Sequence, residues 1–422
     1  MNKNWYRLDT AALLFPAVMN KNWSNAFRLE ATINHEVDPF VLQKAVDDLK
    51  VRFPSFYVGL RTGFFWSYLQ QMEGTPQVMT DFAYPLTFMS YRELKNCCIR
   101  ILYYKNRVAV ELFHAVTDGT GGNIYLCSLL ARYLEIKFEI DIGKSPFVVN
   151  HDEPVTAEEL EDSFHRYTNN YPASRKESKS YQIKGTKNRS DYYTLITGVI
   201  ETERLKEVSK NYGCTITAFL TAVMIESLIE MQQQKRFPHL QKHVKVTIPI
   251  NLRRLYGSKT VRNFVLPLNV GVDPKKGDYS LKDLCNSIAS QLNYEITPQN
   301  MASKIASNVT PQKNFLLQIT PLIFKRLVLG AIYHQSGVLT SCLNISNLGV
   351  ITLPEEMNPF VERIEFIISP QKNSINNCSV SSYKKHTFIN INRNIVESEL
   401  ERRFFSKLVE LNIPVTIECN RG

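Results

Sequence analysis

Residues 113–122 read Phe-His-Ala-Val-Thr-Asp-Gly-Thr-Gly-Gly and follow directly on a stretch in which apolar side chains alternate. The alternation over residues 107–113 is the period-two pattern of a strand with one buried face. The glycines that follow are typical of a sharp turn, and residues 124–136 then repeat apolar positions at helical spacing. This order predicts a strand that carries His114 at its end, a turn, and a helix.

The same stretch contains the pattern H-x-x-x-D-G at His114, Asp118 and Gly119. An imidazole at a strand end can face a cleft with a pKa near working pH, as a general base requires. Asp118 can fix the loop that carries the histidine, and Gly119 allows the turn a positive φ. The glycines at 119, 121 and 122 argue against a helix there. The alternative is a loop histidine beside an ordinary Asp-Gly turn.

Alternating strands and amphipathic helices occur in both halves of the chain, which predicts an α/β (α+β) protein with two domains of similar size. We place the first domain at residues 1–175, a basic linker at 176–190 and the second domain at 191–422. The segment 174–189 supports the linker, because it carries six basic residues, one acid and little to bury. The main expected helices are 39–53, 157–167, 215–232, 281–294, 316–333 and 396–411, and the later strands are 192–200, 244–250, 263–270, 341–346, 362–369, 374–383 and 386–392.

The composition is that of an ordinary globular protein, with 44% hydrophobic and 21% charged residues in 422. The net charge of +10 favours anionic partners, and a merely basic surface is the alternative. Nucleic acid is not predicted as a partner, because the basic segment 174–189 contains a single aromatic residue, Tyr181. The N-terminus makes a poor secretory signal, so we expect a cytoplasmic protein.

Several catalytic and metal-binding patterns are missing from the sequence. There is no C-x-x-C, no G-x-S-x-G, no complete phosphate-binding loop and no dinucleotide fingerprint. His239 and His243 have metal-like spacing, but no Glu follows His239 and Pro238 precedes it. We therefore expect no metal.

The stretch from Leu316 to Tyr333 is the most apolar helical pattern, although Pro321, Lys325 and Arg326 interrupt it. We interpret it as a helix buried within the second domain. The alternative is a helix that contacts a membrane surface.

The H-x-x-x-D-G stretch resembles the active-site signature of the CoA-dependent acyltransferase superfamily. Three further blocks are similar to its alcohol acetyltransferase-like group: Tyr6–Asp9 with Phe15–Val18, Pro249–Arg253 with Arg262–Phe264 after it, and a weaker one at Ser346–Gly349. Phe113 stands where peptide-synthetase condensation domains and chloramphenicol acetyltransferase have a first histidine. The alcohol acetyltransferase-like or polyketide-associated branch therefore fits best.

This resemblance implies two chloramphenicol-acetyltransferase-like subdomains, with mixed sheets flanked by helices and an active-site tunnel at their interface. It implies acyl-CoA as co-substrate and a small alcohol or amine as acceptor. His114 would act as general base, and Asp118 would pair with an arginine of the other half, most simply Arg253, to hold the His114 loop. Gly119 would serve the turn.

Other residues carry weaker implications. Arg254, Lys259 and Arg262, near Arg253, would bind the phosphates of CoA, and an exposed basic loop is the alternative. Ser346 and Asn347 would line the tunnel or donate to an oxyanion, and a structural turn is the alternative. Two other functions stay open: a condensation-like enzyme that takes its acyl group from a carrier protein, and a non-catalytic binding protein with the same fold.

Overall fold

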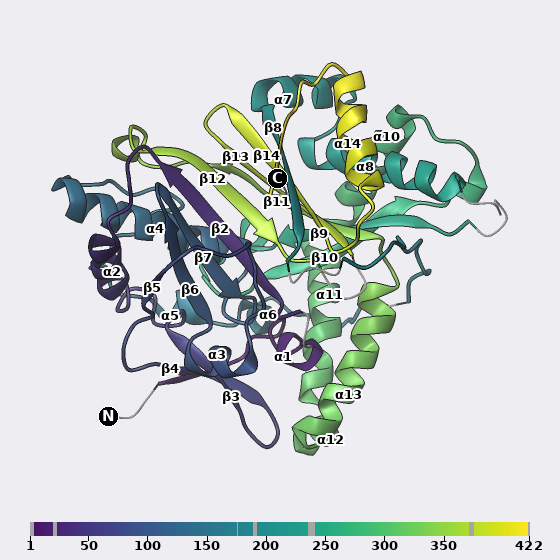
Figure 1. Ribbon diagram of the computed structural model, residues 1–422. Helices are drawn as coiled ribbons and strands as arrows, with labels where there is room; N and C mark the ends of the chain where they lie inside the picture. Colours follow the sequence, from purple (N-terminus) through teal and green to yellow (C-terminus); the bar gives the residue numbers. More distant parts are fainter. Residues whose placement is uncertain are drawn as a thin grey trace.

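The computed structural model describes residues 4–19, 23–174, 176–188, 192–234, 241–370 and 375–420. The first half builds a five-stranded sheet, whose order β12-β2-β7-β6-β5 is antiparallel except for β5 beside β6. The helices α2 and α4 pack on this sheet and on each other, and their apolar faces form one core (Figure 1). The bounds are β2 (Ala26–Ile33), α2 (Pro39–Asp48), β5 (Val78–Thr80), β6 (Ile99–Tyr104), β7 (Arg107–Phe113), α4 (Gly119–Phe138) and β12 (Val361–Ile368).

The second half builds a seven-stranded sheet in the order β10-β9-β11-β13-β14-β8-β15. The strand β11 runs parallel to both of its neighbours and the other pairs are antiparallel. α8 packs against β9 and also contacts α7, α10 and α14, around a second core (Figure 1). The bounds are β8 (Thr194–Glu201), α7 (Thr202–Asn211), α8 (Ile216–Gln233), β9 (Val244–Asn251), β10 (Val265–Val272), α10 (Leu281–Glu295), β11 (Leu343–Ile351), β13 (Asn376–Tyr383), β14 (His386–Arg393), α14 (Glu399–Glu410) and β15 (Thr416–Cys419).

The chain therefore has two mixed sheets flanked by helices, which confirms the predicted fold class. The strand β12 joins the two parts, because it belongs to the second half by sequence but pairs with β2, with Ile364 opposite Ala31. The division at residues 175 and 191 stays a prediction, and residues 175 and 189–191 lie outside the described residues.

The remaining elements lie around these sheets. A small sheet has the order β1-β4-β3, and the short helices connect the larger elements. Their bounds are β1 (Trp5–Arg7), α1 (Phe15–Val18), β3 (Val58–Thr62), β4 (Ser67–Gln71), α3 (Tyr91–Asn96), α5 (Ala157–Leu160), α6 (Ser163–Arg166), α9 (Arg253–Tyr256), α11 (Pro298–Val309), α12 (Phe315–Ile319) and α13 (Leu322–Tyr333).

Two helix predictions were wrong in detail. The expected helix 157–167 is two short helices, α5 and α6. The expected helix 316–333 is broken before Pro321 into α12 and α13, because the residue before a proline is driven out of the helical region; Thr320 has ψ 128°. α13 is also not buried in the second domain, since among its residues only Lys325 is buried.

None of the described helices is by itself both long and apolar enough to cross a membrane. The pair α7 and α8 meets the length and composition of a span only when joined across a bend of 76°.

Candidate active site

The helix α4 begins at the end of the H-x-x-x-D-G pattern, with Asp118 as its N-cap. The carboxylate oxygen Oδ1 of Asp118 accepts hydrogen bonds from the backbone N–H groups of Thr120 and Gly121, both at 3.1 Å. The prediction that residues 119–122 form a turn rather than a helix was therefore wrong. The capping bonds, together with close packing around the glycines, outweigh the poor helix propensity of glycine.

Gly121 allows the first turn of α4 to touch the loop before β10. A Cβ atom at this position would lie 2.2 Å from the carbonyl oxygen of Val261 and 2.1 Å from Oγ1 of Thr117. These two groups are themselves hydrogen-bonded at 2.6 Å. Gly119 is close to β11 and β12 in the same way, because its Cβ would lie 2.9 Å from Leu348 and 3.2 Å from Phe366. The glycines thus bring the two halves together at the motif.

We expect Gly121→Ala to lower the free energy of unfolding by about 1–3 kcal/mol, because the added methyl group meets backbone that cannot move away freely. Gly330→Ala is the matched control, since a Cβ at Gly330 in α13 meets no atom within 4 Å and alanine favours a helix by about 1 kcal/mol. Urea unfolding of both variants measures the difference. Equal stability of the two would contradict the close approach.

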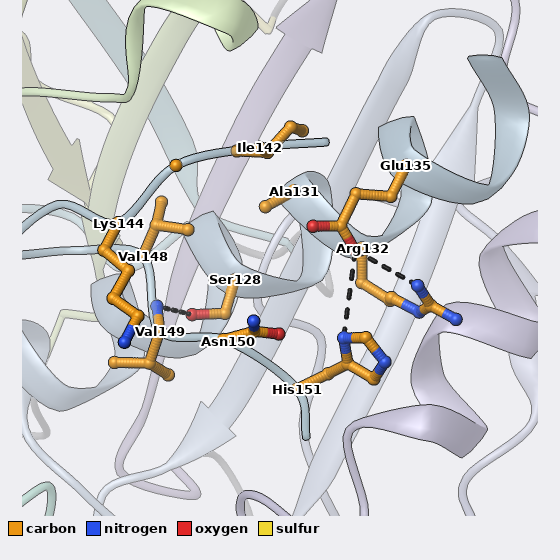
Figure 2. Close-up of a pocket in the computed structure, with 11 residues that line it drawn as sticks. Ser128, Ala131, Arg132, Glu135, Ile142, Lys144, Val148, Val149, Asn150 and His151 are labelled. Carbon is orange, nitrogen blue, oxygen red and sulfur yellow. Dashed lines mark hydrogen bonds and ion pairs between the residues drawn. The ribbon is translucent and has the colours of Figure 1, made fainter. Parts of the chain in front are cut away.

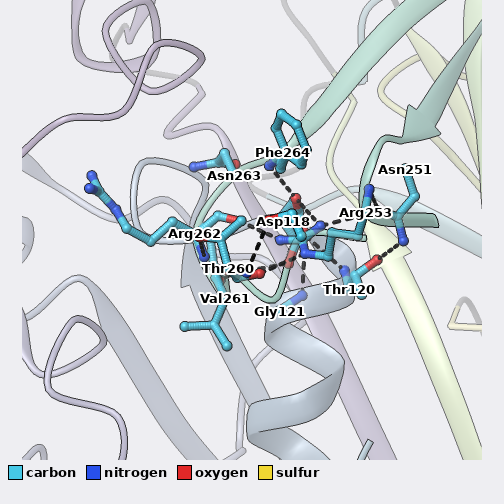
Figure 3. Close-up of polar contacts among 12 residues, drawn as sticks. Asp118, Thr120, Gly121, Asn251, Arg253, Thr260, Val261, Arg262, Asn263 and Phe264 are labelled. Atoms are coloured by element: carbon cyan, nitrogen blue, oxygen red, sulfur yellow. Dashed lines mark hydrogen bonds and ion pairs between the residues drawn. The ribbon is translucent and has the colours of Figure 1, made fainter. Parts of the chain in front are cut away.

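Asp118 also binds the second half of the chain, and Figure 3 shows these contacts. Its other oxygen, Oδ2, lies 2.8 Å from Nη1 of Arg253 and accepts a hydrogen bond of 2.8 Å from the backbone N–H of Phe264. Both side chains are nearly fully buried, at 9% exposure for Arg253 and 1% for Asp118. Arg253 donates further to the backbone carbonyls of Thr260 and Arg262. The ion pair expected from the resemblance is therefore present, and it ties the His114 loop to the loop before β10.

His114 lies between β7 and α4 and is partly exposed. Its ring packs against Phe15 of α1, with centroids 4.6 Å apart, and against Phe27 of β2, with centroids 5.2 Å apart. The imidazole thus sits at the surface of the first core, at the point where the loop before β10 reaches it.

Asn263 holds the His114 ring. Its Nδ2 donates to the backbone oxygen of His114 at 2.9 Å and to Oδ2 of Asp9 at 3.0 Å, so its Oδ1 must accept at the other end of the amide. That Oδ1 lies 2.9 Å from Nδ1 of His114. Nδ1 therefore carries the proton, and Nε2 keeps its lone pair.

Burial lowers the pKa of His114 below its usual 6.5, although the hydrogen bonds to its own backbone and to Asn263 and the charge of Asp118 act to raise it. The neutral ring is then the main form at neutral pH. A neutral imidazole with the proton on Nδ1 can accept another proton at Nε2.

Asp9 supports Asn263 from the N-terminal segment. It accepts hydrogen bonds from Asn263 and from the backbone N–H of Ala12, and Arg262 lies 3.8 Å away. Burial raises the pKa of Asp9 to about 6, against the charge of Arg262.

The predicted phosphate-binding residues do not form one group. Arg254 and Lys259 are exposed, and Lys259 lies 3.7 Å from Glu158. Arg262 is buried, and its guanidinium donates to the backbone carbonyls of Arg7 and Leu160. Arg253 is occupied by Asp118. Only Arg254 and Lys259 are thus placed to meet a phosphate in solution.

Ser346 and Asn347 lie on β11, next to the bulge between Asn347 and Val350. The amide of Asn347 donates to Thr217 at 3.0 Å and accepts from the backbone N–H of Gly349 at 2.8 Å, so it shapes this bulge. Gly349 has φ +78°, which favours glycine. Ser346 is partly exposed.

Two recesses occur elsewhere on the described part of the chain. The first, lined along α4 by Ser128, Arg132 and Glu135 and across from them by His151, is shown in Figure 2; Arg132 and His151 lie against the Glu135 carboxylate at 3.1 and 3.8 Å. The second lies between α1, β4 and α13. His114 lines neither of these two, so the tunnel stays a prediction. Among the described residues there is no cluster of three potential metal ligands, and His239 lies outside them.

Sequence reasoning assigned no role to Asn263 or Asp9. Both occur in sequence blocks that resemble the alcohol acetyltransferase-like group, and this resemblance was the signal that could have identified them as site residues. The hydrogen bond between Asn263 and His114 joins residues 149 positions apart, and the one between Asn263 and Asp9 joins residues 254 positions apart. No local pattern in the sequence reveals such contacts.

Comparison with known proteins gives a family and a fold. The model of the alcohol acetyltransferase family matches residues 161–383, more than half of the chain. This segment contains Arg253, Asn263 and Asn347, whereas the H-x-x-x-D-G pattern precedes it. A search of curated proteins found no match.

The chain is similar along nearly its whole length to several solved structures. F. graminearum TRI101 complexed with coenzyme A and T-2 mycotoxin is 12% identical, with a TM-score of 0.65 over 98% of this chain and 99% of that one. TRI3 trichothecene 15-O-acetyltransferase from Fusarium sporotrichioides is 11% identical, with a TM-score of 0.62 over 97% and 94%. Polyketide synthase associated protein 5 from Mycobacterium tuberculosis is 14% identical, with a TM-score of 0.58 over 95% and 96%.

The family match and the two-subdomain fold agree with the resemblance seen at the motif. The chain belongs to the alcohol acetyltransferase family.

Proposed function

We propose that the protein transfers an acyl group, most simply acetyl, from a CoA thioester to the hydroxyl group of a small alcohol, with His114 as general base. The observation that carries the proposal is the His114 imidazole, which is partly exposed and held by Asn263 so that Nε2 is the basic nitrogen. TRI101, which has the same fold, is described in complex with coenzyme A.

In this mechanism Nε2 of His114 takes the proton from the hydroxyl group of the alcohol while the hydroxyl oxygen attacks the thioester carbonyl. The tetrahedral intermediate then breaks its carbon–sulfur bond, and His114 returns the proton to the leaving thiolate. The products are an ester and a free thiol, so no other reactant is needed. A positioned base of this kind contributes about 10²–10⁴ in rate, and positioning of both substrates supplies much of the remainder.

The other residues position His114 or bind the substrates. Asp118 and Arg253 hold the loop that carries His114, and Asn263 with Asp9 holds the ring. Ser346 is our candidate oxyanion donor, because it is partly exposed on β11. Arg254 and Lys259 are the candidates for a CoA phosphate.

A thiol-release assay tests this function. Wild-type protein with acetyl-CoA and a panel of short and long alcohols should release free CoA faster than protein with acetyl-CoA alone, and ester should form in equal amount. Lack of turnover with every acyl-CoA and alcohol, in a folded protein, would contradict it.

A carrier protein is the alternative acyl donor. Burial of Arg262 leaves two exposed cations, Arg254 and Lys259, where three were expected to bind the phosphates of CoA. A weaker CoA site is the observation that favours a carrier protein as donor. Turnover with an acyl-pantetheine thioester, but not with acyl-CoA, would favour the carrier. Binding of an alcohol without any turnover would favour a non-catalytic protein.

The pH dependence of kcat/KM follows from the lowered pKa of His114. Since the base must be neutral, activity is expected to decline as the pH falls through this lowered pKa. The apparent pKa of this acid limb should therefore lie below 6.5. A limb centred above pH 6.5, measured with an acceptor that does not itself ionise, would contradict the assignment.

A further inference from the structure

The helices α12 and α13 expose a run of large apolar side chains. Figure 1 shows them in green, with α12 at an end of the molecule where α11 and α13 project beyond the two large sheets. Eight large apolar side chains in 18 residues are exposed there, from 40% for Ile332 to 72% for Leu327. We call this surface the α12–α13 face; its members are Phe315, Leu316, Ile319, Ile323, Phe324, Leu327, Val328 and Ile332.

The spacing within α13 shows that this is one side of the helix. Ile323, Phe324, Leu327, Val328 and Ile332 stand at positions i, i+1, i+4, i+5 and i+9, which an α-helix places on a common face. In contrast to scattered surface hydrophobics, which need no explanation, a contiguous exposed patch marks an interaction site.

The opposite side of α13 is firmly attached to the protein by Lys325. The Lys325 ammonium is buried, donates to the backbone oxygens of Phe65 and Gln318 at 3.0 and 3.1 Å, and lies 3.5 Å from the centre of the Trp66 ring. Burial lowers the pKa of this amine below its usual value. The backbone N–H of Leu322 also donates to the backbone oxygen of Phe64 at 2.9 Å. The orientation of the exposed side is therefore set by the fold.

These contacts bring the turn between β3 and β4 beside α13. Phe64, at the tip of that turn, is 72% exposed, and Phe65 is 41% exposed. The turn thus adds aromatic side chains to the edge of the α12–α13 face.

The two sequence segments that form this face and its edge contain basic residues but no acidic ones. The sequence contains no Asp or Glu from residue 296 to residue 354, nor from residue 49 to residue 72. The same segments contain Arg61, Lys304, Lys313 and Arg326. Lys304 lies 3.4 Å from Glu295, whereas Lys313, just before α12, is exposed. The whole chain carries +10. An apolar, aromatic surface whose own segments carry basic but no acidic residues is complementary to an anionic lipid surface, in which apolar side chains enter the acyl region and cations meet the headgroups.

We propose that the α12–α13 face docks on an anionic lipid surface. A protein partner fits less well, because protein interfaces are only a little over half apolar and have a polar rim, whereas the exposed large side chains of α13 are almost all apolar. The proposal does not depend on the enzymatic activity. Docking would also place the His114 site near the lipid, since α13 packs on α1 and Phe15 of α1 packs against the His114 ring.

Vesicle flotation with the full-length protein tests the docking. We expect the wild type to float with vesicles of phosphatidylcholine and phosphatidylglycerol, and to bind at least about tenfold more weakly to phosphatidylcholine alone and at high salt. The double variant Ile323→Glu/Leu327→Glu should lose at least about tenfold in partitioning, because two exposed apolar side chains are replaced by charges that anionic lipid repels. The matched control is Phe40→Glu, since Phe40 of α2 is 85% exposed and lies outside the face.

All three proteins should have the same melting temperature, because the replaced side chains are exposed. Failure of the wild type to float, equal binding to both vesicle types, flotation of the double variant at the wild-type level, or an equal loss in Phe40→Glu would each overturn the proposal. So would light scattering that shows a wild-type dimer and a monomeric double variant, because a second copy of the chain would then cover the face.

Discussion

His114→Ala is expected to lower the rate of acyl transfer by about 10²–10⁴-fold and to leave the protein folded. The loss follows from the removal of Nε2, the basic nitrogen of the only imidazole that the H-x-x-x-D-G pattern supplies. The cost in stability should stay within about 1–3 kcal/mol, because the main structural loss is the hydrogen-bond partner of Asn263. Thiol release from acetyl-CoA with a good acceptor measures the rate, and urea unfolding measures the stability.

His386→Ala is the matched control for this variant, because His386 is an exposed histidine at the start of β14. It should retain wild-type turnover. If His114→Ala turned over at a rate near that of the wild type, another group would have to be the base.

Asp118→Ala should have the largest effect on stability, lowering the free energy of unfolding by about 3–5 kcal/mol. The change leaves the buried Arg253 guanidinium without its anion, removes the N-cap of α4, and leaves the backbone N–H of Phe264 unpaired. Activity should fall with it, although Asp118 does not bond to the His114 ring. Urea unfolding and thiol release on the same sample measure both effects.

Variants of Arg253 separate the ion pair from the other roles of Asp118. In a double-mutant cycle of Asp118→Asn and Arg253→Met, the double variant should lose less free energy of unfolding than the two single variants lose together. The reason is that the second change removes the charge that the first change leaves uncompensated. Arg254→Ala is the control, since Arg254 is next to Arg253 in the sequence and its side chain is exposed. Additive losses in the cycle would show that the two residues do not interact.

Local patterns in the sequence were sufficient for most of the individual elements. The alternation over residues 107–113 coincides with β7, and the expected helix 215–232 corresponds to α8. Local patterns do not predict which distant strands pair with each other. The strand β12 was expected within the second half, but its partner is β2, and no periodicity in either strand identifies the other.

The failure at residues 316–333 has a different cause. Periodicity shows that one side of a helix is apolar but does not show whether protein covers that side. In α13 the apolar side faces outward and the buried residue is Lys325, which finds carbonyl oxygens and an aromatic ring. The glycines after Asp118 misled in a similar way, because their low helix propensity was weighed without the tight contact at Val261.

For the site, the resemblance placed His114, Asp118 and Arg253 together, and the structure shows the Asp118–Arg253 pair. It grouped Arg262 with the exposed cations, whereas that side chain is buried against the N-terminal segment. Residue type alone does not distinguish an arginine that binds a substrate from one that binds backbone carbonyls.

A crystal structure of the wild-type protein with CoA tests the role of His114 most directly. We predict that the thiol sulfur lies within hydrogen-bonding distance of Nε2 of His114 and that the ring keeps its contact with Asn263. CoA bound with its thiol far from this ring, for example in the recess beside His151, would contradict the proposed mechanism.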